Sequence, residues 1–297
     1  MDIRILRYFL ITTREENITK AAELLNITQP TLSRQLMQLE DDLGVKLFNR
    51  GKQKITLTKD GLLLKRRAQE IVQLLDKTKQ ELTSNDEELI GEISLGCGEV
   101  YNMKCLAQII KAFRKEHPLV RISIFSAIAD DVKDRMDNGI LDLGLFVEPV
   151  DISKYEFIRM PLKEIWGIVV NKDSSLAQKK SVFPEDFIGI PLIIPKREAV
   201  QNELANWFGD YYARLDIAAT YNLANNAAVM ALENFGVVLC LRRINLSAEL
   251  HFVPLSPQLE TGAVLAWKKH QDYSLVTDHF IKYVKGYYRN IISPETE

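Results

Sequence analysis

One stretch of 25 residues, NITQPTLSRQLMQLEDDLGVKLFNR, constrains the fold more than any other part of the chain. Thr28 can cap a helix whose first turn accepts Pro30, because an N–H group at that place has no intrahelical partner. Gly44 can end the same helix as a C-cap. Between these ends, one apolar stripe recurs at spacings of 4, 3 and 4 and consists of Leu32, Leu36, Leu39 and Leu43. The stretch therefore predicts a helix with one buried face and one polar face.

The polar face of this helix carries side chains that match the edges of DNA bases. The helical period turns Gln29, Ser33, Arg34 and Gln38 outward, mostly along the N-terminal half. Arginine and glutamine can make bidentate contacts with guanine and adenine in the major groove. Thr28 and the N–H groups at the helix start can hold a phosphate. Taken alone, the pattern also fits an ordinary solvated amphipathic helix.

The segments around this helix favour the DNA-binding interpretation. An amphipathic helix from Leu6 to Thr13 comes first, followed by a short second helix that Asn17 or Thr19 can cap. After the third helix, two short β segments flank Gly51 and can pair as a hairpin. This order of elements is typical of a winged helix-turn-helix. The hairpin would then place three basic residues near phosphates or the minor groove: Arg50, Lys52 and Lys54.

Charge is distributed unevenly along the chain, although the net charge of the whole is only −2. Residues 1–67 hold 13 Lys and Arg against 8 Asp and Glu, a balance of +5. The remaining residues hold 25 against 32, a balance of −7. A basic N-terminal end indicates a polyanionic partner there.

The segment ITKAAELLNITQPTLSRQLMQLEDDLGVKLFNR, followed by ITLTKDG, resembles the N-terminal signature of the LysR-type transcriptional regulators. The pattern of the rest fits this family over nearly the whole chain. The resemblance implies a winged helix-turn-helix, a dimerising linker helix and a C-terminal effector-binding domain similar to periplasmic solute-binding proteins. It also implies tetramers, built as dimers of dimers, at promoters. The candidate DNA contacts are Thr28, Gln29, Pro30, Thr31, Ser33, Arg34, Gln38, Arg50, Lys52 and Lys54.

The segment after Thr58 predicts a long helix that pairs with a second copy of the chain. Its apolar positions follow a 4-3-4-3-4 spacing, which is typical of a coiled-coil seam. The same stripe could instead pack on the chain's own core. The polar segment SNDEELIGE then indicates a hinge. The candidate dimerisation residues are Leu64, Ala68, Ile71, Leu75 and Leu82, with Thr78 in the same seam.

Short β-rich runs alternate with helical stretches after Gly91, which predicts a parallel α/β architecture with room for two lobes. We therefore expect an α+β multidomain protein. Its predicted parts are a winged helix-turn-helix at 1–58, a linker helix with a hinge at 59–90 and an effector-binding domain at 91–297. Within that domain, lobe I would comprise 91–160 and 266–297, and lobe II 161–265.

Similarity to the family implies an effector cleft between the two lobes. Ligands in such sheets lie where strand ends meet helix N-termini, and these termini favour anions. Many family members have Ser or Thr after the first strand of this domain, whereas this chain offers Glu99, whose carboxylate would repel an anion unless it is paired or turned outward. Lys196 and Arg197 favour the opposite charge, or are simply solvated. The cleft candidates are Gly98, Glu99, Val100, Tyr101, Ser126, Ala127, Ile128, Pro195, Lys196, Arg197, Asn222 and Asn225.

Other classes of function find less support in the sequence. The four histidines show no ligand spacing, and no nucleophile elbow or Gly-rich phosphate loop occurs, so we expect neither an enzyme nor a metal or other cofactor. A transported-solute receptor would explain the C-terminal half but not the first 90 residues. A redox switch at Cys97 and Cys105 is a third alternative, in which only Lys104 could activate a thiol.

The expected partners follow from the DNA-binding interpretation. They are double-stranded operator DNA, a small-molecule effector, further copies of the chain as a homodimer or homotetramer, and RNA polymerase at promoters. The N-terminus has no signal-peptide pattern, and no apolar run is long enough for a membrane span, so we expect a cytoplasmic protein without a membrane partner.

Overall fold

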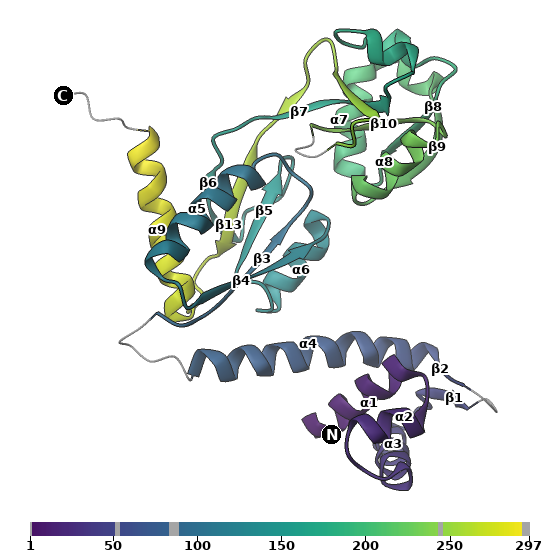
Figure 1. Cartoon of the computed structure of the whole chain (residues 1–297), viewed down its shortest axis with the longest axis vertical. Helices are drawn as coiled ribbons and strands as arrows, with labels where there is room; N and C mark the ends of the chain where they lie inside the picture. Colours follow the sequence, from purple (N-terminus) through teal and green to yellow (C-terminus); the bar gives the residue numbers. More distant parts are fainter. Residues whose placement is uncertain (1, 51–53, 83–88, 243–245, 293–297) are drawn as a thin grey trace. The chain divides into compact units, whose positions relative to one another are not determined.

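The computed structural model describes residues 2–50, 54–82, 89–242 and 246–292 (Figure 1). The chain divides into two units, Met1–Thr83 and Ser84–Glu297, and each has its own core. The first unit contains α1 (Ile3–Glu15), α2 (Ile18–Leu24), α3 (Gln29–Leu43), the antiparallel strands β1 (Phe48–Arg50) and β2 (Ile55–Leu57), and α4 (Lys59–Leu82).

Local side-chain caps determine where the helices of the first unit begin. The Asn17 side chain accepts hydrogen bonds from the N–H groups of Thr19 and Lys20, at 2.9 and 3.1 Å. Thr28 caps α3 in the same way, through the N–H group of Thr31 at 3.4 Å. Gly44 ends α3 with a φ of +67°, in the left-handed region that glycine adopts most readily.

The buried face of α3 is shorter than the leucine stripe predicts. Leu32, Leu36 and Leu39 are buried in the core of the first unit. Leu43 was expected in the same stripe, but its side chain is 39% exposed. It lies at the last position of the helix, where the chain leaves the core at Gly44, so the prediction was wrong at this residue.

A buried carboxylate joins α3 to the start of the wing. Glu40 is 3% exposed, and its Oε1 atom accepts hydrogen bonds from the N–H groups of Leu47, at 2.8 Å, and Phe48, at 3.2 Å. Its Oε2 atom lies 3.2 Å from Nζ of Lys46. Gly61, in the first turn of α4, lies so close to this segment that an added methyl group would overlap the carbonyl oxygen of Leu47.

The inner side of α4 packs on the first unit itself, which changes the predicted dimerisation seam. Ala68 is fully buried in the core of this unit, and Leu64 packs against the same core. Asp76 pairs with Arg7 of α1. Ala68 therefore faces the chain's own core, as the alternative interpretation of the stripe allowed, and the prediction that it contacts a second copy was wrong. Leu64 is only partly buried by the same core. Ile71 remains exposed.

The second unit contains two sheets of different strand order. The first sheet has the order β4-β3-β5-β13-β6, with α5 and α9 in the core on one face and α6 in the core on the other. Its strands are β3 (Gly91–Cys97), β4 (Val120–Ser126), β5 (Leu143–Val147), β6 (Tyr155–Arg159) and β13 (Ala263–Lys268). Its helices are α5 (Met103–Glu116), α6 (Ala129–Asp137) and α9 (Leu275–Ile292).

The second sheet has the order β11-β7-β10-β8-β9, and β12 also pairs with β7. Its core helices lie on opposite faces, α7 on one and α8 on the other. The strands are β7 (Glu164–Asn171), β8 (Pro191–Pro195), β9 (Asp216–Tyr221), β10 (Val237–Leu241), β11 (Leu250–Pro254) and β12 (Glu260–Thr261). The helices are α7 (Glu198–Phe208) and α8 (Ala224–Leu232), with short 3-10 helices at Ser175–Gln178, Pro184–Phe187 and Gly209–Arg214.

The chain crosses between the two sheets twice, from β6 to β7 and from β12 to β13. The strands that follow these crossings run antiparallel to their neighbours: β7 to β10 and β11, and β13 to β5 and β6. Both sheets are therefore mixed, and the prediction of a parallel architecture was wrong for these strands, because they enter by a crossing from the other sheet.

The second crossing lies earlier than expected. Lobe I was predicted to resume at Ala266, but β13 begins at Ala263 and pairs there with Val147 of β5. The predicted boundary therefore cuts through a strand that belongs wholly to the first sheet. Within the residues that the structure describes, no helix has both the length and the apolar composition needed to span a membrane.

Candidate DNA interface and ligand cavity

The first turns of α3 present a continuous polar surface. Gln29, Pro30, Thr31 and Arg34 are exposed and Ser33 is half-buried, whereas the opposite side of the helix is held in the core. The hydroxyl groups of Thr28 and Thr31 lie 2.8 Å apart at the helix start. Farther along the helix, the Gln38 side chain donates to Asp42 Oδ1 at 2.8 Å, so part of its hydrogen-bonding capacity is used within α3.

Of the three basic residues predicted for the wing, the structure describes the side chain of Lys54. Lys54 Nζ lies 3.2 Å from Glu16 Oε2, and both side chains are exposed, so the pair is screened by solvent. To contact a phosphate, the Lys54 ammonium group must move away from the Glu16 carboxylate or bind both groups at once. The side chain of Arg50 and the whole of Lys52 lie outside the described residues.

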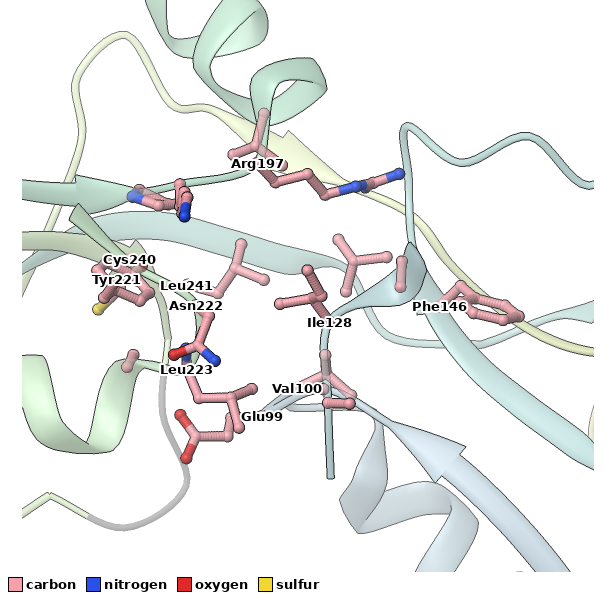
Figure 2. A pocket seen from close by; sticks show the side chains of 18 of the residues that line it. Glu99, Val100, Ile128, Phe146, Arg197, Tyr221, Asn222, Leu223, Cys240 and Leu241 are labelled. Atoms are coloured by element: carbon pink, nitrogen blue, oxygen red, sulfur yellow. The ribbon is translucent and has the colours of Figure 1, made fainter. Parts of the chain in front are cut away.

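A cavity of about 510 Å³ lies between the two sheets of the second unit (Figure 2). The first sheet lines it with residues after β3 and β4 and with the end of β5, and the second sheet with residues after β8 and β9 and the end of β10. The carboxyl ends of strands from two sheets therefore meet at one site, which is the usual place for a ligand in α/β architectures.

Most of the predicted cleft residues line this cavity. The structure brings together Gly98, Glu99, Val100, Ala127, Ile128, Pro195, Lys196, Arg197 and Asn222. Three others lie outside its lining. Tyr101 points its backbone N–H group at Glu164, Ser126 is an exposed residue at the end of β4, and Asn225 lies one residue beyond the lining, inside α8.

Sequence reasoning missed much of the apolar wall. The missed lining residues come from the strands β5, β7, β9 and β10 and from the starts of the helices. A usable signal exists for β5 and β10, since each is a buried apolar run whose carboxyl end should face the same cleft as its neighbours. The missed residues include Leu145, Phe146, Val147, Trp166, Tyr221, Leu223, Cys240 and Leu241.

Two side chains that line the cavity, Glu99 and Arg197, make contacts between the lobes. Glu99 Oε2 accepts a hydrogen bond from the N–H group of Asn225 at 3.1 Å. Arg197 donates from Nη1 to the carbonyl oxygen of Pro149 at 2.7 Å, and its Nε lies 3.8 Å from Asp130 Oδ2. Figure 2 shows Glu99 and Arg197 on opposite sides of the space between the lobes.

A buried polar network fastens the lobes beside the crossing into β7. Glu164 and Asn102 are both fully buried. The Glu164 carboxylate accepts from the N–H groups of Tyr101 and Asn102, each at 2.9 Å, and from Asn102 Nδ2 at 2.7 Å. Asn102 also donates to Leu162 O at 2.8 Å and accepts from Leu162 N at 3.2 Å. Because this buried carboxylate is held by several donors, the network stabilises one geometry of the crossing.

The thiols lack the environment of reactive cysteines. Burial raises the pKa of the Cys97 thiol. Burial also raises the pKa of Cys105, with a smaller contribution from Glu164, and Lys104 offsets only part of it. A higher pKa means less thiolate at neutral pH, so the structure gives the redox alternative no support. The described residues also contain no cluster of three or more His, Cys, Asp or Glu side chains that could hold a metal.

A helix-turn-helix unit joined to an α/β unit with a cavity between two sheets defines a class of ligand-responsive DNA-binding proteins. Two family models match this chain: the bacterial regulatory helix-turn-helix protein, lysR family, over residues 3–62, and the LysR substrate binding domain over residues 86–289. The chain therefore belongs to the LysR family of transcriptional regulators, whose members are not enzymes. The match over residues 3–62 decides against a transported-solute receptor.

Individual relatives agree with this assignment. The chain is 39% identical to the HTH-type transcriptional regulator BsdA of Bacillus subtilis over 213 residues, which cover 70% of this chain and 72% of the relative. It is 28% identical to the regulator YtlI of the same organism over 225 residues, 74% of this chain and 72% of the relative.

Solved structures share the fold over almost the whole length. The crystal structure of CbnR, a LysR family transcriptional regulator, has a TM-score of 0.77 at 19% identity and covers 96% of this chain and 99% of its own. Full-length CbnR complexed with its target DNA has a TM-score of 0.75 at the same identity, with the same coverage of both chains. The predicted family and architecture are thus confirmed.

Proposed function

We propose that this transcriptional regulator reads operator DNA with the first turns of α3. The observation that carries the proposal is the exposed polar surface formed by Gln29, Thr31, Ser33 and Arg34 on a helix whose other face is buried. In a helix-turn-helix, the N-terminal part of the second helix of the motif enters the major groove. Arg34 and Gln29 supply the base contacts, while Thr28 and the backbone at the helix start hold a phosphate.

The protein works as a homodimer or homotetramer at promoters, where RNA polymerase is a further partner. Half-sites one DNA turn apart need at least two recognition helices. The outward face of α4 supports this assembly, because Ile71 and Leu74 expose apolar side chains on it. Since its partner is chromosomal DNA, the protein acts in the cytoplasm.

A small molecule in the cavity between the lobes controls DNA binding. Contacts between the lobes at Glu99 and Arg197 support this role, because a ligand beside them can strengthen or replace them. The effector must bind two arrangements of the lobes with different affinities, or the equilibrium between them does not shift. Closure or rotation of the lobes then changes the spacing of the recognition helices in the oligomer.

Titration of the full chain against two DNA duplexes tests this function. One duplex carries the region upstream of the protein's own gene, and the other carries the same bases in shuffled order. We expect preferential binding to the first, and an affinity that falls as salt rises because phosphate contacts release counterions. Equal affinity for both duplexes at every salt concentration would contradict the proposal.

A further inference from the structure

The charges around the ligand cavity indicate which chemical class of effector it accepts. Three helices, α6, α7 and α8, begin at the cavity, and their first residues line it. Helix N-termini carry partial positive charge and unpaired N–H groups, so such a site ordinarily attracts an anionic ligand. An anionic ligand can use these helix N-termini only if no carboxylate of the chain already lies at them.

The chain's own carboxylates already lie at these helix ends. Asp130 and Asp131 occupy the first turn of α6, and Glu198 is the first residue of α7. The start of α8 receives Glu99 from the other lobe, through the N–H group of Asn225. Before α5, two further amide groups bond the buried carboxylate of Glu164. An incoming carboxylate would therefore meet negative charge at each terminus.

The basic residues of the lining do not outnumber these carboxylates. Arg197 already bonds the carbonyl oxygen of Pro149 and pairs with Asp130. Lys196 is exposed, so water screens its charge in the same way as those of the exposed Asp130 and Glu198. Among the lining residues, three carboxylates, from Glu99, Asp130 and Glu198, face two basic side chains.

The remaining wall is largely apolar. Phe146, Ile128, Val100 and Leu241 belong to this wall (Figure 2). Trp166 also lines the cavity, but its indole Nε1 atom is buried away from the open space, so a ligand meets only the apolar part of this side chain.

We propose that the effector is an uncharged, largely apolar molecule that carries no carboxylate. This inference rests on the proposed function, because it assumes that the cavity is the effector site. The apolar wall binds the body of the ligand. Glu99 occupies the α8 terminus that a carboxylate would otherwise use.

Matched aryl probes test the charge that the cavity accepts. We would measure the binding of benzamide, benzoate and benzylammonium to the full chain by calorimetry, and repeat the series with the larger 2-naphthyl amide, carboxylate and methylammonium. The amide of each series should bind about tenfold or more tightly than its charged analogues, the difference expected for one unfavourable polar contact.

Glu99→Ser provides the decisive variant. It frees the start of α8, so the carboxylate probes should gain affinity, and the preference of the wild-type chain for amides over carboxylates should narrow or reverse. Glu249→Ser is the matched control, because it removes the same charge from an exposed position outside the cavity lining and should leave the preference unchanged. Thermal melting of each variant without a probe verifies that it is folded.

Three results would overturn the inference: a carboxylate or an ammonium probe that binds the wild-type chain as tightly as its amide, a panel in which no amide binds, or a Glu99→Ser variant with unchanged preference. DNA binding is measured separately without probes. A chain that selects its upstream DNA but prefers carboxylates would contradict only this inference, whereas a chain that does not select DNA would contradict the proposed function.

Discussion

At the scale of single residues, Glu40 is the side chain on which the position of the wing depends most. A buried carboxylate is unfavourable unless donors surround it, and Glu40 receives two backbone N–H groups and Lys46. Glu40→Gln removes the charge from these hydrogen bonds and places an amide against Lys46. We expect the free energy of unfolding of the first unit to fall by about 1 to 3 kcal/mol, measured by urea denaturation at neutral pH. Unchanged stability would show that the network is dispensable.

The same carboxylate gives the first unit a defined response to acid. Burial raises the pKa of Glu40, but the N–H groups of Leu47 and Phe48 and the charge of Lys46 outweigh it, and the net pKa lies below the ordinary value of 4.5. A lowered pKa in the folded state means that this stabilisation is complete above the unfolded pKa and disappears as pH falls through the folded pKa. The wild-type chain should therefore lose more stability than Glu40→Gln as the pH is lowered from 6 toward and below 4.5, as followed by thermal melting.

The helix caps could be predicted from the sequence, whereas the buried hydrogen-bond network of Glu40 could not. The caps at Asn17, Thr28 and Gly44 depend on neighbours a few residues away, so their patterns are visible in the sequence. Glu40 lies within an acidic run, Glu40–Asp42, that looks solvated. Its partners follow six to eight residues later, and only the packing of the wing against α3 brings them to it.

At the scale of elements, α4 shows that the period of apolar residues does not identify the partner of a helix face. A heptad pattern identifies an apolar face but does not say what covers it. Here α1 covers Leu64 and Ala68, while Ile71 and Leu74 lie in the exposed part of the helix. Leu74 was absent from the predicted seam because it does not follow the 4-3-4 spacing of the buried face.

A carboxylate introduced on the exposed side of α4 should affect association, whereas one introduced on the buried side should affect folding. Leu74 is 42% exposed, so Leu74→Asp should weaken association between copies with little effect on the fold of the monomer. Ala68 is 0% exposed, so Ala68→Asp buries a carboxylate without a partner and should unfold or strongly destabilise the first unit. Sedimentation equilibrium and circular dichroism separate these outcomes. A Leu74→Asp variant that associates like the wild-type chain would contradict the role given to this face.

At the scale of the whole molecule, the alternation of strands and helices predicted the α/β architecture, and strand ends identified much of the cavity. The contacts across it were not predictable in this way. Glu99 and Asn225 are 126 residues apart in the sequence, and their hydrogen bond depends on how two separately formed sheets face each other. The strand boundary at Ala263 was missed for a similar reason, because pairing with β5 determines where β13 begins.

The central claim, that α3 reads base sequence, is tested most directly by comparing Arg34→Ala with Arg121→Ala. Both remove one exposed arginine, the first from the recognition surface and the second from β4 in the other unit. Fluorescence anisotropy would measure each variant on the upstream duplex and on its shuffled control. We expect Arg34→Ala to lose about 1 to 3 kcal/mol of binding free energy on the upstream duplex, with a smaller loss on the shuffled one. Arg121→Ala should match the wild-type chain on both. Equal losses on the two duplexes for Arg34→Ala would contradict the account.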